Sequence, residues 1–453
     1  MKDTIQSKKF TDMILTIIIT FILGYTLIAL ERQIGVSKTA IALILGITLW
    51  VFALFQTKLD VNTQIIEHLG NTAEILFYLL GAMTIVEWVD THEGFNLITK
   101  YITTRNKRKL LWLIAFITFI MSSVLDNLTT AIVMIMLLRQ LVTNQQERWI
   151  FGSIIIIAAN AGGAWTPIGD VTTIMLWIHN NITSMNVIRH LFLPSLVSLL
   201  IPVGIATFWL KGEIQDQSAS IRPNLPGISH KEQITILALG IGSLIFVPVF
   251  KELTNLPPFM GIMFALGCVW IYTEMLYNRK KNVTQENTHR IPSILSKVDY
   301  STLLFFLGIL MAVAALQVVG ILDQMATFLN DRIHNVYFIN TIIGFLSSVI
   351  DNVPLVAAAM GMYPIADPGT AGYMANFIQD GIFWEFLSYC AGVGGSILII
   401  GSAAGVVAMG LEKINFGWYL KNISLLALIG YLAGAGVYIL EAIYLKPLIE
   451  STL

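Results

Sequence analysis

Charged residues are scarce in this 453-residue sequence: Asp, Glu, Lys and Arg together make up 12%, about half the share of a typical soluble domain. Hydrophobic residues make up 56%, so the chain lacks the polar side chains that a soluble protein of this length needs at its surface. The apolar residues come in blocks such as Ile14 to Leu30, close to the roughly 20 residues that span a bilayer as a helix. The composition predicts an all-α polytopic membrane protein and excludes a soluble enzyme or a nucleic-acid binder.

Other absences narrow the function further. The two cysteines, Cys268 and Cys390, both lie inside apolar segments, so no disulfide framework is expected. The sequence contains no HExxH, GxSxG or Walker motif, and its seven histidines lack metal-ligand spacing. Because the net charge is only -1, no global field attracts an anionic partner. We therefore expect no enzymatic activity and no cofactor.

Three short motifs occur twice in the chain, in the same order and 225–232 residues apart. The pairs are FYLLGAM (77–83) and FFLGILM (305–311), SSVLDNL (122–128) and SSVIDNV (347–353), and AGGAWTPIGD (161–170) and VGGSILIIGS (393–402). Chance rarely produces three repeated motifs in the same order. The sequence therefore predicts an internal duplication.

Basic residues indicate that the two copies cross the membrane in opposite directions. One cluster follows the apolar segment 71–89, whereas another precedes the equivalent segment 299–320. Basic residues favour the cytoplasmic side, so one segment ends in the compartment where its counterpart begins. The clusters are Arg105, Lys107, Arg108 and Lys109, then Arg279, Lys280, Lys281, Arg290 and Lys297. We expect two inverted-topology repeats, residues 1–210 and 233–453, joined by a polar linker at 211–232, with residues 12–30 as the first membrane helix.

Each repeat is expected to contain a re-entrant helical hairpin followed by a broken transmembrane helix. Residues 110–138 are too few for two spans and carry the polar SSVLDN near their middle, which indicates a hairpin; residues 336–363 are its counterpart. The segments 150–177 and 382–411 are long and interrupted by glycines, which favours a break. Those glycines are Gly162, Gly163, Gly394 and Gly395. Non-helical backbone at membrane depth is tolerated only inside protein or facing water.

Acidic residues inside apolar segments are costly and are functional candidates by default. Asp126 and Asp351 occupy equivalent positions at the two hairpin tips, and each is followed by an asparagine, Asn127 or Asn352. We expect the tips to meet near the middle of the membrane, where their oxygens, half-helix ends and free carbonyls can coordinate Na+. The alternative is a plain hydrogen-bonded plug between helices, which the recurrence of the pattern in both repeats disfavours.

Asp170 breaks the symmetry of the two repeats, because Ser402 is its counterpart. Its polar neighbours in the sequence are Asn160, Thr166, Thr172 and Thr173. Burial of a carboxylate favours the protonated form, whereas a bound cation favours the ionised form, so one group takes a proton or a cation but not both comfortably. That competition is the physical basis of cation/proton exchange. Asp170 can also cap the second half of the broken helix, and the two roles are compatible.

Glu74, near one end of the segment 71–90, has no acidic counterpart in the second repeat. The sequence leaves two interpretations open. Glu74 is either an access-path or regulatory carboxylate, or an ordinary solvated residue.

The motifs SSVLDN and AGGAWTPIGDVTT, repeated as SSVIDN and VGGS, resemble those of NhaD-type sodium/proton antiporters, a family of the ion transporter superfamily. The similarity runs from about residue 70 to the C-terminus. It implies exchange of Na+, and usually Li+, for H+ by a homodimer in the bacterial inner membrane, serving pH and sodium homeostasis. Carried onto matching positions, the functional residues are Asp126, Asn127, Asn160, Asp170, Thr172, Thr173, Ser347 and Asn352. Repeat symmetry adds Asp351, Gly394, Gly395 and Ser396.

Two other functions stay open at this point. Organic-acid and arsenite carriers share the superfamily, but Asp126, Asp170 and Asp351 would repel an anion, and neither tip motif contains Lys or Arg. A cation channel is the second alternative. Broken helices in inverted repeats favour alternating access instead, so we expect an antiporter in the lipid bilayer with Na+, Li+ and H+ as its substrates.

Overall fold

The computed structural model describes residues 2–56, 60–95, 97, 104–214, 229–279 and 290–445. Within these residues every regular element is helical, and two isolated β-bridges are the only strand-like pairings. In the same described ranges, seven helices are long and apolar enough to cross a membrane. The prediction of an all-α, multi-pass membrane protein is confirmed.

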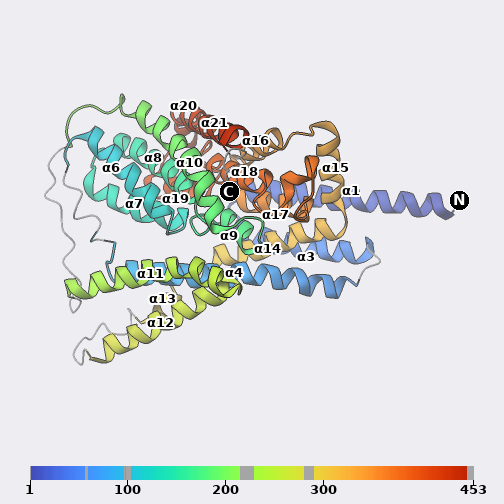
Figure 1. Ribbon diagram of the computed structural model, residues 1–453, viewed down its shortest axis with the longest axis horizontal. Coiled ribbons are helices and arrows are strands. Elements are labelled where there is room, and N and C mark those ends of the chain that lie inside the picture. The colour runs from blue at the N-terminus through green and yellow to red at the C-terminus, as the bar shows by residue number, and fades with distance from the viewer. Residues whose placement is uncertain are drawn as a thin grey trace.

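The helices pack in two groups that lie side by side (Figure 1). The framework group comprises α1 (Lys2–Ala29), α2 (Glu31–Ile34), α3 (Lys38–Gln56), α4 (Val61–Thr91), α11 (His230–Thr254), α12 (Pro258–Arg279), α13 (Ile291–Leu295) and α14 (Tyr300–Val318). The hairpin group comprises α6 (Lys107–Ser122), α7 (Asn127–Leu141), α8 (Gln145–Gly163), α9 (Val171–Ile178), α10 (Ser184–Ala206), α16 (Val336–Ser347), α17 (Asn352–Met362), α18 (Ile382–Gly394), α19 (Ala403–Glu412), α20 (Phe416–Asn422) and α21 (Ser424–Leu440). Between α14 and α16 lies α15 (Ile321–Arg332); η2 (Gly372–Phe377) precedes α18, and the π-helical turn η3 (Glu441–Leu445) follows α21.

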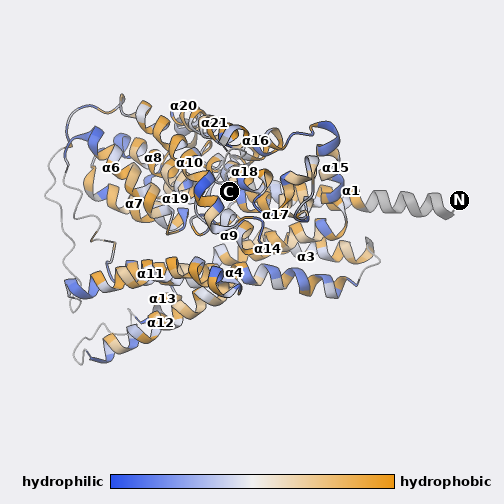
Figure 2. Ribbon diagram, viewed as in Figure 1, coloured by the Kyte–Doolittle hydropathy of each residue, from blue (hydrophilic) through white to orange (hydrophobic). Residues whose placement is uncertain are grey.

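Large apolar side chains cover the outside of both groups. Ile47 of α3 and Leu253 of α11 in the framework group and Leu425 of α21 in the hairpin group, for example, are 68%, 78% and 64% exposed. An exposed apolar surface of this extent favours contact with a membrane or another protein. Figure 2 shows the hydrophobic colour along the helices of both groups, whereas hydrophilic residues gather at the connecting segments. The outward apolar face suits contact with lipid tails, as expected of a membrane protein.

Helix α4 is longer than the apolar segment 71–89 indicated, because it begins at Val61. Asp60 caps this end: its carboxylate accepts hydrogen bonds from the backbone N–H of Asn62 at 3.1 Å and from the Thr63 hydroxyl at 2.7 Å. The first turns of α4 are polar in sequence and hydrophilic in Figure 2. A hydropathy pattern therefore detects only the apolar part of the helix, while the cap determines where the helix starts.

Two other boundaries differ from the sequence prediction. The first helix, predicted at residues 12–30, extends from Lys2 to Ala29. Residues 215–228 of the predicted linker lie outside the described residues, and its last residues already belong to α11. There, Ser229 and Glu232 form a capping box, in which each side chain bonds the backbone of the other. Reciprocal caps of this kind start helices in polar sequence.

Four helices begin at breaks in longer apolar segments, and a side chain caps each of them. Asp126 caps α7 after the turn that follows α6, and Asp351 caps α17 after the turn that follows α16. Asp170 caps α9 after the break that follows α8, and Ser402 caps α19 after the break that follows α18. Cap oxygens satisfy backbone N–H groups that have no partner in the helix. The polar residues of the repeated motifs are therefore the ones that start these four helices.

Each hairpin packs against the following broken helix backbone to backbone, through equivalent contacts. The Ser122 hydroxyl donates to the Ala159 carbonyl at 2.6 Å, and the Ser347 hydroxyl donates to the Ala391 carbonyl at 2.8 Å. A Cβ atom on Gly162 or on Gly394 would lie 2.3 Å from a backbone oxygen of the adjacent hairpin. The contacts recur at positions that the repeated motifs align, and the duplication itself stays a prediction. The opposite orientation of the two repeats in the membrane stays a prediction.

We expect Gly162→Ala to destabilise the protein by about 1–3 kcal/mol, the usual result of overpacking, because the new methyl would meet the Phe119 carbonyl. Gly204→Ala, in α10, is the matched control, since a Cβ there meets nothing within 4 Å. Thermal unfolding of the detergent-purified variants measures both effects. Equal melting temperatures for the two variants would contradict the close packing of α6 on α8.

Candidate functional site

A buried carboxylate, Asp170, lies where the two hairpins meet the broken helix of the first repeat. Its side chain is 1% exposed. The Asn127 amide donates to Oδ2 of Asp170 at 2.6 Å, and the Asn352 amide donates to Oδ1 at 3.4 Å. The backbone N–H and the hydroxyl of Thr172 donate to Oδ1 at 2.9 and 2.7 Å. One carboxylate therefore joins the tips of both hairpins.

Asn160 extends this network to the broken helix of the second repeat. Its Oδ1 accepts a hydrogen bond from the Asn127 amide at 3.1 Å. Its own amide donates to the hydroxyls of Ser396 and Ser402, both at 2.9 Å. The side chains of these four residues, Asn127, Asn160, Ser396 and Ser402, are each at least 95% buried. Residues from both repeats thus form a single polar cluster inside an apolar interior.

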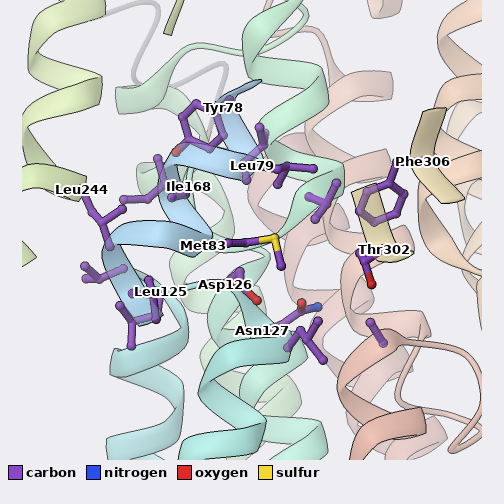
Figure 3. Close-up of a pocket in the computed structure, with 17 residues that line it drawn as sticks. Tyr78, Leu79, Met83, Leu125, Asp126, Asn127, Ile168, Leu244, Thr302 and Phe306 are labelled. Atoms are coloured by element: carbon purple, nitrogen blue, oxygen red, sulfur yellow. The ribbon is translucent and has the colours of Figure 1, made fainter. Parts of the chain in front are cut away.

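Asp126 lies next to this cluster but faces a different space. Its carboxylate accepts hydrogen bonds from the backbone N–H and the hydroxyl of Thr129, at 2.8 and 2.6 Å. It lines a cavity of about 50 Å³ together with Met83 of α4 and Thr302 and Phe306 of α14 (Figure 3). A bound water occupies roughly 10–15 Å³ of such volume, so the cavity has room for water molecules or a partly hydrated ion.

Asp351, the equivalent of Asp126 in the second hairpin, has a different partner. Its Oδ2 lies 3.5 Å from the Nζ atom of Lys38, the first residue of α3. Its Oδ1 accepts a hydrogen bond from the backbone N–H of Val353 at 3.3 Å. The two tip aspartates therefore flank the Asp170 cluster without joining its hydrogen bonds, whereas the two tip asparagines join it directly.

Several other predicted site residues lie beside the cluster. The Thr173 hydroxyl contacts the Ser388 hydroxyl at 3.1 Å, and the Ser347 hydroxyl bonds the Ala391 carbonyl. Gly163 and Gly395 lie at the breaks, where a Cβ atom would come within 3 Å of the Gly169 or Gly401 carbonyl oxygen. These residues shape the backbone around Asp170 and do not bond it.

Glu74 lies on α4, away from this hydrogen-bonded cluster. It is close enough to interact electrostatically with His179, at the end of α9, and with Lys251 of α11. Lys251 in turn donates a hydrogen bond to the Trp177 carbonyl of α9 and lies over the Trp177 ring. Glu74 thus belongs to a separate contact between the framework group and the C-terminal end of α9.

The cluster concentrates negative charge and hard oxygen atoms. Asp126 and Asp351 are both close enough to Asp170 to interact with its charge. Carboxylate, amide and hydroxyl oxygens suit hard cations. Among the described residues, no group of three or more His, Cys, Asp and Glu side chains could hold a metal ion, so the donors are not those of a transition-metal site. The arrangement can exchange a proton for a small cation at one carboxylate.

Two members of the site were not among the residues predicted from the sequence. The sequence indicates Ser402 only as the counterpart of Asp170, although its position before α19 is a typical N-cap position. Lys38 lies far from the motifs in sequence, and no local pattern indicates that it approaches Asp351. The only available signal was a lysine at the start of an apolar helix.

The sequence of the chain matches known transporters along most of its length. A match to a family described as citrate transporter covers residues 25–378. "Sodium/proton antiporter 2" of Arabidopsis thaliana is 45% identical over 425 residues, which cover 92% of this chain and 97% of that protein. "Na(+)/H(+) antiporter NhaD" of Alkalimonas amylolytica is 29% identical over 450 residues, covering 92% and 89%. The protein of the same name from Vibrio cholerae is 28% identical over 454 residues, covering 93% and 91%.

These matches and the repeated Asp-Asn motifs agree. The motifs that resembled NhaD-type proteins are the ones that form the buried cluster. The chain therefore belongs to the NhaD-type sodium/proton antiporters, within the citrate transporter family.

Proposed function

We propose that this protein exchanges Na+, and Li+, for H+ across a membrane, with Asp170 as the group that binds a proton and the cation in turn. The observation that carries this proposal is the position of Asp170, a buried carboxylate that bonds the asparagines of both hairpin tips. An unpaired charge there is costly, so Asp170 favours having either a proton or a cation. The names of the relatives support the same exchange.

The asparagines around Asp170 can stabilise it both without a bound cation and with one. An asparagine amide has a donating nitrogen at one side and an accepting oxygen at the other. In the present arrangement Asn127 and Asn352 donate to the carboxylate, which compensates its charge in the absence of a cation. Rotation of these amides would present oxygens to a bound ion, while Asp170 supplies the neutralising charge. No cofactor is needed for this exchange.

The cavity beside Asp126 is the proposed entry to this site. Residues of the framework group, such as Met83 and Thr302, and residues of the hairpin group, such as Leu125 and Ile168, line this cavity together (Figure 3). Asp126 and Asn127 both line this cavity, and Asn127 bonds Asp170, so the charge of Asp126 attracts a cation to a position next to the cluster. Relative movement of the two groups would open the site to one side of the membrane and then to the other, as alternating access requires.

The description of the matched family raises citrate as a second candidate substrate. The site argues against an anion. Three aspartates lie at or beside the cluster, and Lys38, the lysine that the described part of the chain brings to a tip, is paired with Asp351. Side-chain carboxylates occupy three of the four helix N-termini, positions that otherwise bind anions. A citrate carboxylate would meet like charge at each of these three.

We further propose that the protein works as a homodimer in the inner membrane of a bacterium, where it contributes to pH and sodium homeostasis. The bacterial relatives support this location, while the more similar relatives come from a plant. Fractionation of the cell of origin tests the location directly.

In proteoliposomes with an acid interior and an internal pH dye, we expect Na+ and Li+ added outside to release protons. K+ and citrate, added in turn, are the comparison substrates. A response to citrate without a response to Na+ or Li+ would overturn the cation assignment. Flux that does not couple to the pH gradient would indicate a channel instead.

Asp170→Asn and Asp126→Asn are each expected to lower the apparent sodium affinity by more than about 100-fold, beyond the 10–100-fold loss typical for changes to outer-shell partners of an ion. Asparagine caps helices about as well as aspartate, so these changes remove charge and preserve the cap. Asp60→Asn, at the exposed cap of α4, is the matched control and should exchange normally. Wild-type affinity in either site variant would contradict its assigned role.

We expect the sodium concentration for half-maximal exchange to rise by up to about tenfold for each unit that the pH falls, over the range in which H+ and Na+ compete for one carboxylate. The sign follows from the competition, because a protonated Asp170 must lose its proton before it can bind Na+. Initial rates at several external pH values measure this dependence. A half-saturating concentration that does not change with pH would rule out a shared site.

A further inference from the structure

Among the residues that the structure describes, Lys38 is the basic residue whose ion pair with a hairpin tip is seen, and it comes from the framework group. Its Nζ atom lies 3.5 Å from Oδ2 of Asp351 and 4.3 Å from the centre of the Phe305 ring. The Lys38 and Asp351 side chains are 28% and 18% exposed. The backbone N–H of Lys38 donates to the Glu31 carboxylate at 2.8 Å, which fixes the start of α3 next to the tip. The ammonium group is thus held at Asp351 from a different part of the chain.

At the equivalent tip of the first hairpin, no such partner is found among the described residues. Asp126 faces a cavity whose lining residues, all within the described part of the chain, include no Lys, Arg or His. The described hydrogen bonds of the Asp126 side chain both come from Thr129. Two motifs of nearly the same sequence, SSVLDN and SSVIDN, therefore end in different electrostatic surroundings.

We propose that Lys38 is a tethered counter-cation for Asp351. Its ammonium group occupies the cation position at the second hairpin tip and so restricts cation uptake to the side of Asp126 and Asp170. This inference deepens the proposed function and rests on it. The lysine ammonium is a compact unit charge, so it supplies the neutralisation that a sodium ion would supply at the same carboxylate. Lys38 thus determines how many cations the site accepts.

Tethering gives Lys38 an advantage over a free ion. A group attached through a short chain has an effective concentration of at least millimolar order at its partner. It does not have to be taken from solution or stripped of a full hydration shell for each cycle. Sodium therefore competes poorly at Asp351 while Lys38 is present, and competes freely when the ammonium group is removed.

The test counts sodium ions on the purified full-length protein by equilibrium binding of radioactive 22Na+. Lys38→Met removes the charge and preserves most of the side-chain length, and it should bind one more Na+ per chain than the wild type. The double variant Lys38→Met/Asp351→Asn should bind the wild-type number of Na+ ions per chain, and so should Lys38→Arg, which retains the charge.

The matched control is Lys107→Met, which breaks the distant Lys107–Glu147 pair. This variant should also bind the wild-type number of Na+ ions.

An unchanged count in Lys38→Met would overturn the proposal, since a merely structural ion pair alters stability without creating an ion site. If Lys38→Met binds as many Na+ ions as the wild type but melts at a lower temperature, the Lys38–Asp351 pair is only structural. If Lys38→Met loses exchange, Asp351→Asn in the same chain should restore it; failure to restore it would also overturn the proposal.

The same measurement separates this inference from the proposed function. Wild-type protein that binds no Na+ and moves none would contradict sodium/proton exchange. If the wild type binds no Na+ but Lys38→Met binds one ion, the proposed role of Lys38 would still be supported. If neither protein binds Na+, both the role of Lys38 and the proposed sodium/proton exchange would be refuted.

Discussion

The hydrogen bonds between Asp170 and the two tip asparagines are the contacts on which the rest of the site depends. A carboxylate with 1% exposure inside an apolar interior needs donors, and the nearest ones come from Asn127, Asn352 and Thr172. Satisfying it requires both hairpin tips to end at the same place. The glycine contacts between each hairpin and its broken helix provide the close approach that this requires.

Four helix N-termini surround this cluster, and their caps set its charge. Asp126, Asp170 and Asp351 cap three of them and Ser402 caps the fourth. The positive end of a helix dipole stabilises a carboxylate placed there, so the fold compensates part of the negative charge that it concentrates. A scaffold with serines at these positions would cap the same helices without negative charge, and would not repel an anion. This chain fills them with its own carboxylates, which makes the same scaffold suited to a cation.

The site is asymmetric although its scaffold is built from two similar halves. Asp170 stands opposite Ser402, and Asn160 corresponds to Gly392 in the aligned motifs. Asp126 borders a cavity, whereas Asp351 is paired with Lys38. The two hairpins with their repeated motifs thus provide two comparable tips, and the differences between their surroundings leave one buried carboxylate at the centre. A single carboxylate that both tips contact is what a one-site exchange of a proton for a cation requires.

The sequence by itself determined where the helices break and which residues lie at the breaks. A cluster of serine, aspartate, asparagine and glycine inside an apolar segment favours a point where the backbone leaves the helix, and Asp126, Asp170 and Asp351 lie at such points. Only the tertiary structure decided that the asparagine of each Asp-Asn pair, and not the aspartate, bonds Asp170, because the direction of a side chain depends on the backbone angles of its turn. Tertiary packing alone also placed Lys38 beside Asp351, since that contact follows from how α3 packs on α14 and no local pattern records it.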